Sequence, residues 1–465
     1  MRAQIFFFFL QLAVLLPQIS AQQCEPFVLT LETAISRALN FNRSILGSDD
    51  NVTQAEYQVS VADGEFDLMI YPNGNLGYVG GGYAGSGLAW GTGVDFVKRL
   101  PWGTRIDIMP SLEKVHDNWH TNARTRITQP LLRGLGREFT YANVYAAQFS
   151  WRSAMRAQYL AQCQLIIRTV GTLYDLIKTY KSVELSEKSF ERIRKFYQAA
   201  KLKSKIGLAD PLDIYRAETE MRQAEDMLTS SKERFQEVED HLRDILALPP
   251  DIPLEVDIPM IFTHTDIPVD EAIGTALTNR IEIDQAEDAL QDNRRVSKLA
   301  QDRLWPALDF VLNYSNCGAD QVFTECFSTR RETTWGFGFT TSTDFNPVAQ
   351  RAVVDQTLIA ISASGRNLDQ VKSNVTFDIK RVLRRLERSR QKIELQEKQI
   401  HTARGELRLS EIKFNRGMAN NFDMIQAEKT LRTSELNYWN ALIDHIVEEY
   451  HLLNSLGMLI EKPQC

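Results

Sequence analysis

Hydrophobic residues recur at alternating spacings of four and three along several long parts of the chain. One such series runs over 159–180, a second over 214–245 and a third over 436–453. This spacing forms the seam of a coiled coil. No proline interrupts residues 131–210 or 348–462, and proline is the residue that most strongly breaks a helix. The pattern therefore predicts long helices that pack side by side.

Two helical stretches are too long for an ordinary globular domain. Residues 138–206 and 348–416 each give 69 uninterrupted positions, or on the order of 100 Å of helix. A glycine follows each stretch, at Gly207 and Gly417, and glycine readily takes the positive φ that ends a helix. The sequence therefore predicts two long helical hairpins.

The turn of each hairpin is one of two internal repeats. Residues 206–214 return as 416–424, at an offset of 210 residues, and residues 32–43 return at an offset of 238 residues. Asp213 and Asp423 take the third helical position after each turn, where a carboxylate meets free N–H groups. We expect a first repeat over 22–250 and a second over 251–465.

Two zones between the helices have the sequence of strands. They cover about 66–136 and 304–346, and five of the seven tryptophans lie in them. Residues 307–314 and 335–339 alternate in polarity. Short alternating strands with aromatic girdles are typical of a membrane β-barrel. A soluble extracellular β-domain fits such strands nearly as well, so the strands alone leave the choice open.

The N-terminus indicates export. Residues 1–21 contain Arg2, an apolar run and a small-residue site at Ala21, as in a secretory signal peptide. No other segment reaches the ~18 apolar residues of a membrane-spanning helix. The net charge of −7 argues against a nucleic-acid partner.

The five cysteines are few for a disulfide-stabilised fold. Cys317 and Cys326 lie nine residues apart in a polar loop, and export favours a disulfide between them. Cys163 sits at an apolar helical position and is expected to be a free core thiol. Whether Cys24 carries a lipid or pairs with Cys465 stays open.

No catalytic or cofactor site is expected. His116 and His120 lie four residues apart without an acidic or cysteine partner at ligand spacing, so we assign them to a loop or barrel rim rather than to a metal. No glycine-rich phosphate loop follows a strand. The basic run at 380–392 is interleaved with glutamates and fits a solvated coiled-coil face. The chain is therefore not expected to be an enzyme.

The order of these features resembles the TolC family of outer-membrane efflux proteins. Residues 128–134 look like the family's strand-to-helix junction, the two glycine turns like its periplasmic tips, and residues 242–246 and 452–457 like its helix endings. The resemblance covers nearly the whole mature chain.

The resemblance implies a homotrimer in the outer membrane, with four strands per chain in one 12-stranded barrel and the helices forming a periplasmic tunnel. Such a duct receives substrate from an inner-membrane transporter through a periplasmic adaptor, in efflux or type I secretion. The first repeat carries 28 extra residues, roughly 94–115. They fit an additional hairpin that the sequence does not place.

The resemblance also implies two kinds of site. Adaptor docking would fall on Gly207, Leu208, Ala209, Gly417, Met418 and Ala419. Asp423, with Asp213 in the other copy, would lie at the periplasmic aperture; Gln426 replaces the family's companion acid. The competing interpretation gives these residues only turn and helix-start roles. The competing function is an exported coiled-coil structural or adhesive protein. The substrate and the transporter class cannot be read from the sequence.

Overall fold

The computed structural model describes residues 27–80, 87–205, 211–258, 260, 267–328, 331–416, 418 and 421–463. They form two compact units, and each unit combines segments from both halves of the chain. The first unit takes its described residues from Met1–Asn42, Leu165–His264 and Arg388–Val447. The second takes its described residues from Arg43–Gln164, Thr265–Glu387 and Glu448–Cys465. The predicted signal peptide lies outside the described residues.

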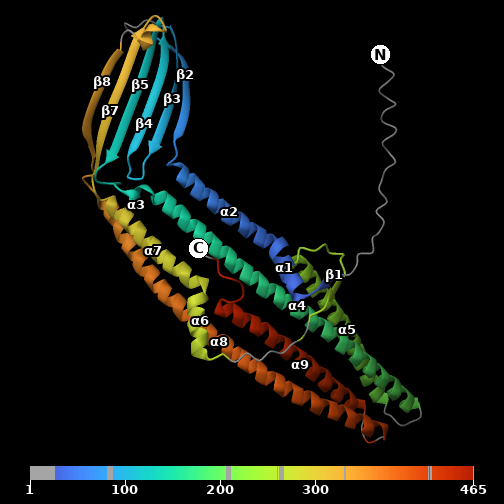
Figure 1. The fold of residues 1–465 in the computed structure, drawn as a ribbon. Coiled ribbons are helices and arrows are strands. Elements are labelled where there is room, and N and C mark those ends of the chain that lie inside the picture. The colour runs from blue at the N-terminus through green and yellow to red at the C-terminus, as the bar shows by residue number, and fades with distance from the viewer. Residues whose placement is uncertain are drawn as a thin grey trace, which may run out of the picture. The chain divides into compact units, whose positions relative to one another are not determined.

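The second unit contains an antiparallel sheet with strand order β2-β3-β4-β5-β7-β8 (Figure 1). Its strands are β2 (Met69–Val79), β3 (Gly87–Arg99), β4 (Arg105–Val115), β5 (Asn118–Pro130), β7 (Ala307–Asp320) and β8 (Arg331–Ser342). A short 3₁₀ turn, η2 (Glu325–Phe327), lies between β7 and β8. All six strands lie within the two zones that the sequence marks as strand-like.

The sheet corrects the expectation of four strands per chain, because it has six. The two additional strands are β3 and β4, joined at a tight turn where the Leu100 N–H donates to the Thr104 carbonyl at 2.8 Å. Gly103 takes φ +94° in that turn. The glycines of β3 make its sequence look like a loop. Packing requires glycine at one of these positions, because a Cβ at Gly93 would come within 2.8 Å of Asn73 Oδ1.

The helices of the second unit pack around small residues. They are α2 (Arg43–Gly64), α3 (Arg137–Thr140), α6 (Val269–Asn279) and α7 (Ile281–Asp302), with parts of the long helices. Ala272 and Ala276 of α6 are fully buried against Ile379 of α8 (Val348–Asn415) and Leu452 of α9 (Asn421–Leu456). The small alanines let α6 lie close to both helices.

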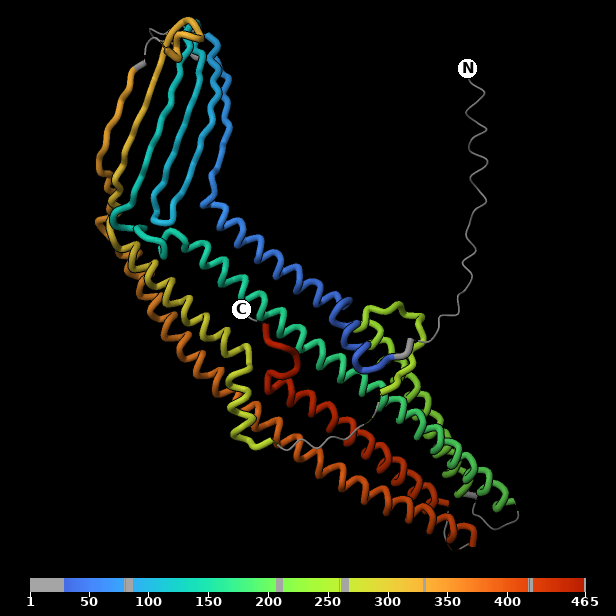
Figure 2. The backbone as a smooth tube through the Cα atoms, in the orientation of Figure 1, coloured from blue at the N-terminus to red at the C-terminus, as the bar shows by residue number. Residues whose placement is uncertain are grey.

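Two helical hairpins dominate the first unit (Figure 2). One joins α4 (Ala142–Lys205) to α5 (Pro211–Ile245), and the other joins α8 to α9. The 64 residues of α4 and 68 of α8 match the long helices that the heptad spacing predicts. The unit also holds α1 (Leu31–Phe41) and a parallel pair of strands, β1 (Phe27–Leu29) and β6 (Leu254–Val256).

Elements of equal length occur in the two halves of the chain. Helices α1 and α6 each have 11 residues, and α2 and α7 each have 22. The boundary between residues 250 and 251 stays a prediction, since both compact units mix the two halves. None of the described helices is long and apolar enough to cross a membrane.

Candidate functional site

One face of the six-stranded sheet carries apolar side chains on every strand, and Lys98 of β3 and Lys114 of β4 share this face. The strand registers place Leu312 of β7 opposite Ile127 of β5 and Phe337 of β8. The same face also carries Leu76, Tyr78, Trp90, Val94, Phe96, Ile106, Ile108, Leu112, Trp119, Phe310, Tyr314, Trp335 and Phe339. Three aromatic side chains of β8, those of Trp335, Phe337 and Phe339, are 65–70% exposed.

The opposite face of the sheet is polar and charged. Adjacent strand positions point to opposite faces, so Asp95, Asp107, Glu113, His120, Asn122, Arg124, Arg126, Asn313 and Glu332 share this second face. Arg105 Nε pairs with Asp107 Oδ1 at 2.8 Å, and Arg126 Nε donates to Asn313 Oδ1 at 3.0 Å. A mainly apolar face opposite a mainly polar face suits a wall between lipid and water.

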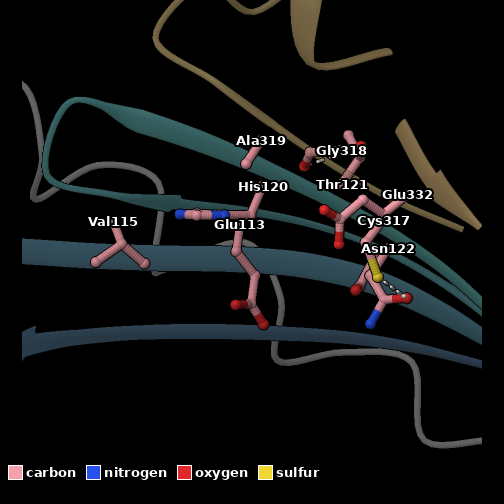
Figure 3. A pocket seen from close by; sticks show the side chains of 10 residues that line it. Glu113, Val115, His120, Thr121, Asn122, Cys317, Gly318, Ala319 and Glu332 are labelled. Atoms are coloured by element: carbon pink, nitrogen blue, oxygen red, sulfur yellow. Dashed lines mark hydrogen bonds between the residues drawn. The ribbon is translucent and has the colours of Figure 1, made fainter. Parts of the chain in front are cut away.

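A hollow of about 860 Å³ lies on the polar face near the β7–β8 connection (Figure 3). Its lining includes Glu113 and His120, which are cross-strand partners, and Cys317 with its neighbours Asn122 and Glu332. Within the described ranges, no three His, Cys, Asp or Glu side chains gather closely enough to hold a metal ion. The hollow is thus an open polar surface of the sheet.

Cys317, which the structure places in β7 and not in a loop, and Cys326 of η2 are both free thiols. Cys317 Sγ lies 3.3 Å from Ser315 Oγ, whereas the Cys326 thiol donates to the Phe323 carbonyl at 2.9 Å. The predicted disulfide between them is not formed. Cys163 is free and buried in the core, beside Tyr159.

The tips of the two hairpins lie partly outside the described residues, including Gly207, Leu208, Ala209, Gly417 and Ala419. Met418 is described and is 65% exposed. Its N–H donates to the Lys413 carbonyl at 2.9 Å, and a bond reaching back five residues closes a helix end in the Schellman manner.

The structure packs the two hairpins together close to these tips. Ala200 and Ala217 of the first hairpin form a buried cluster with Ile425 of the second. Lys203 Nζ donates to the Phe414 carbonyl at 2.9 Å. The ends of both hairpins therefore belong to one packed region within the first unit (Figure 2).

Asp213 and Asp423 occupy the third positions of α5 and α9, as the repeat predicts. Asp423 is exposed and Asp213 is partly buried. The structure places both in the packed region near the tips. Their role at an aperture stays a prediction, since it depends on neighbouring copies of the chain.

Sequence reasoning missed a buried ion pair between the two hairpins. Arg192 of α4 contacts Glu428 of α9 at 2.7 Å, and the Glu428 side chain is fully buried. Burial raises the pKa of Glu428, while Arg192 and Ser189 oppose that rise. Nearby, Lys429 of α9 pairs with Glu220 of α5 at 2.7 Å. Glu428 lies 210 residues after Glu218, at the offset of the repeat, but only the packing shows that Arg192 is its partner.

Comparison with known proteins identifies the architecture. Residues 272–458 match the family model for outer membrane efflux proteins. The match lies within the second half of the chain and includes most of α6, all of α7, α8 and α9, and both strands β7 and β8. Among curated proteins, none matches the chain in sequence.

Solved outer-membrane channels share the fold of this chain. The Campylobacter jejuni CmeC outer membrane channel aligns with a TM-score of 0.73 and 12% identity, over 94% of this chain and 87% of CmeC. The outer membrane protein VceC from Vibrio cholerae gives 0.71 and 16% identity, over 92% and 96% of the two chains. The open-state MtrE channel of Neisseria gonorrhoeae gives 0.68 and 15% identity, over 92% and 89%.

These comparisons confirm the resemblance to the TolC family of outer-membrane efflux proteins. They agree with the predicted outer-membrane location and with a mixed fold of sheet and long helices. At identities of 12–16%, the structural alignments show that the fold is shared.

Proposed function

We propose that the protein is the outer-membrane exit duct of a tripartite efflux or type I secretion system. The observation that carries this proposal is the two-faced sheet, apolar on one side and charged on the other. In lipid, an apolar outer face is needed on every strand, while a polar lumen admits water and solutes. The helical hairpins would continue the duct into the periplasm.

A closed barrel requires more than one copy of the chain. Within the described residues, β2 and β8 each pair on one side only. An open strand edge is not tolerated in the hydrocarbon region, because its N–H and C=O groups would lack partners. Each copy would therefore add its sheet to a neighbour's, and we propose a homotrimer on the model of the family.

The hairpin tips are the proposed docking surface for a periplasmic adaptor, which would link the duct to an inner-membrane transporter. The tips expose several apolar side chains around the predicted turns, those of Leu212, Tyr215, Met418 and Phe422, each at least 50% exposed. Exposed apolar groups at the end of a rigid hairpin suit a protein partner. The transporter would supply the energy.

The alternative is an exported coiled-coil structural or adhesive protein with a soluble β-domain. Such a domain would cover its apolar face, as soluble sheets do. Here Phe337 and Phe339 stand exposed beside Trp335, so the sheet favours the membrane interpretation.

Detergent extraction tests the duct against this alternative. We expect the mature protein to sediment with outer membranes and to leave them only with detergent. In mild detergent the particle should have about three chain masses plus the micelle, the full chain being 53.1 kDa. A monomer or dimer that stays in solution without detergent would overturn the duct.

Replacing Asp423 with alanine should loosen the closed state of the aperture. Three carboxylates around a narrow axis attract cations, so Asp423→Ala is expected to raise single-channel conductance and weaken block by divalent cations. Asp213→Ala tests the other aspartate assigned to the aperture, at the equivalent helical position. Unchanged conductance in both variants would leave both aspartates with the helix-start role alone.

A further inference from the structure

The hairpin of β3 and β4 is built into the middle of the sheet. Its register with β2 runs from Met69↔Val97 to Val79↔Gly87, and its register with β5 runs from Arg105↔Thr128 to Val115↔Asn118. Each strand of the hairpin is therefore paired along its outer side, β3 with β2 and β4 with β5. A flap that folded over the barrel mouth would instead leave β2 and β5 paired with each other.

Both faces of the sheet continue across this hairpin. Val94 and Phe96 of β3 lie on the apolar face, where Phe96 is opposite Ile108 of β4. Asp95 and Asp107, at the intervening positions, lie on the charged face. The hairpin thus has the two-sided pattern of a lipid-facing wall, which a segment lying in water would not need.

The inner turn of the hairpin is fixed to the base of the sheet. Arg99, the last residue of β3, pairs with Glu65 at 3.2 Å. Thr104 donates a hydrogen bond to Gln129 of β5, and the Gly136 N–H donates to the Trp102 carbonyl at 3.4 Å. These contacts hold the turn against residues on both sides of it.

We propose that the hairpin adds a pair of wall strands and widens the outer-membrane pore. The proposal rests on the proposed trimeric duct. Because every neighbouring pair of the six strands is antiparallel, β2 and β8 run in opposite directions. The β8 edge of one copy therefore meets the β2 edge of the next in antiparallel fashion, and three copies close an 18-stranded barrel.

A barrel of this size passes larger solutes than one of 12 strands. Barrel diameter grows roughly linearly with strand number, and barrels of about 16–18 strands leave an aqueous channel. The added lumen positions carry charges, among them Asp95, Asp107 and Glu113. The wide part of the duct is thus suited to bulky, water-soluble cargo.

Removal of the hairpin tests the width. The registers place Val79 and Asn118 at the same end of the sheet, so an Asn-Gly turn can replace residues 80–117 and let β2 pair with β5. Both residues lie on the polar face, so the two faces are kept. In electron micrographs of detergent-purified trimers we expect the barrel of this deletion variant to be roughly one third narrower. Polymers that enter the full-length pore should be excluded.

A second measurement uses the full chain and does not depend on folding of the deletion. A membrane-impermeant maleimide should label Asp95→Cys through the lumen and leave Phe96→Cys unlabelled, with the modified peptide identified by mass spectrometry. Equal labelling of both positions would overturn the wall assignment. An unchanged barrel diameter in the deletion variant, or a particle of two chains, would also overturn the wall assignment. If the protein were still inserted in the membrane, these results would not contradict the proposed duct. A protein that is soluble without detergent would overturn the duct as well.

Discussion

Replacing Leu312 with arginine is expected to prevent stable assembly in the outer membrane. Leu312 lies on the apolar face in the middle of β7, between Ile127 and Phe337. An arginine on the lipid face near the bilayer midplane costs about 2–4 kcal/mol per chain. In the proposed trimer, each of the three chains would carry this cost. The measurement is the yield of the assembled protein in the outer-membrane fraction, together with the urea midpoint in lipid vesicles.

The matched control is Val311→Arg, the same kind of change one position away on the other face. Val311 is opposite Thr128 and Gly338, and its side chain would meet water in the lumen. We expect this variant to assemble with nearly normal yield. If Val311→Arg, and not Leu312→Arg, lowered the yield, the face that carries Val311 would be the one in contact with lipid. If both variants assembled normally, the sheet would not lie in lipid.

Heptad spacing predicts the long helices well because their seams repeat over many turns. Helix α8 begins at Val348, the predicted residue, and ends at Asn415, one residue early. Helix α4 begins at Ala142 instead of residue 138. The short helix α3 intervenes there, and the ring of Tyr141 stacks on Phe66 with centroids 4.1 Å apart. Such a break depends on a contact distant in sequence, which periodicity does not report.

The number of strands is harder to predict from the sequence than the long helices, because β3 is rich in glycine. Gly87, Gly91 and Gly93 lie on one face of β3 together with Ala89, and neighbouring side chains such as Asn73 fill the space beside these glycines. Glycine-rich sequence also suits a loop, so pattern alone does not separate the two. The length difference between the repeats predicts where in the sequence the additional hairpin lies. Only the strand pairing in the structure shows that it belongs to the sheet.

The buried contact of Arg192 with Glu428 could not be predicted from the sequence. A heptad seam shows which side of a helix is buried, but not which residue of another hairpin it meets. Here a carboxylate with no exposed surface on α9 reaches an arginine on α4 that is 31% exposed. The pair joins the two hairpins close to their tips, so its loss should loosen the region proposed to dock a partner.

Replacing Arg192 with methionine is expected to destabilise the helical region by about 3–5 kcal/mol at neutral pH, because it removes the cation that contacts the buried Glu428 carboxylate. Methionine keeps most of the side-chain volume, so the effect isolates the charge. The measurement is the shift of the denaturant midpoint followed by far-ultraviolet circular dichroism. Lys232→Met is the control: Lys232 pairs with Glu187 at 3.1 Å on the surface, and such pairs contribute about 0–1 kcal/mol.

The pH dependence of Arg192→Met gives a second test of the same pair. Burial raises the pKa of Glu428 above its usual range, so the folded state binds the proton more tightly than the unfolded state. Protonation thus stabilises the fold at low pH, and this stability is lost as the pH rises through the folded-state pKa. The free-energy cost of Arg192→Met should therefore grow with pH.

Adding Glu428→Met to Arg192→Met should restore most of the denaturant midpoint, since two packed apolar side chains replace the buried ion pair. A cost equal to that of Lys232→Met at every pH would show that Glu428 does not need Arg192.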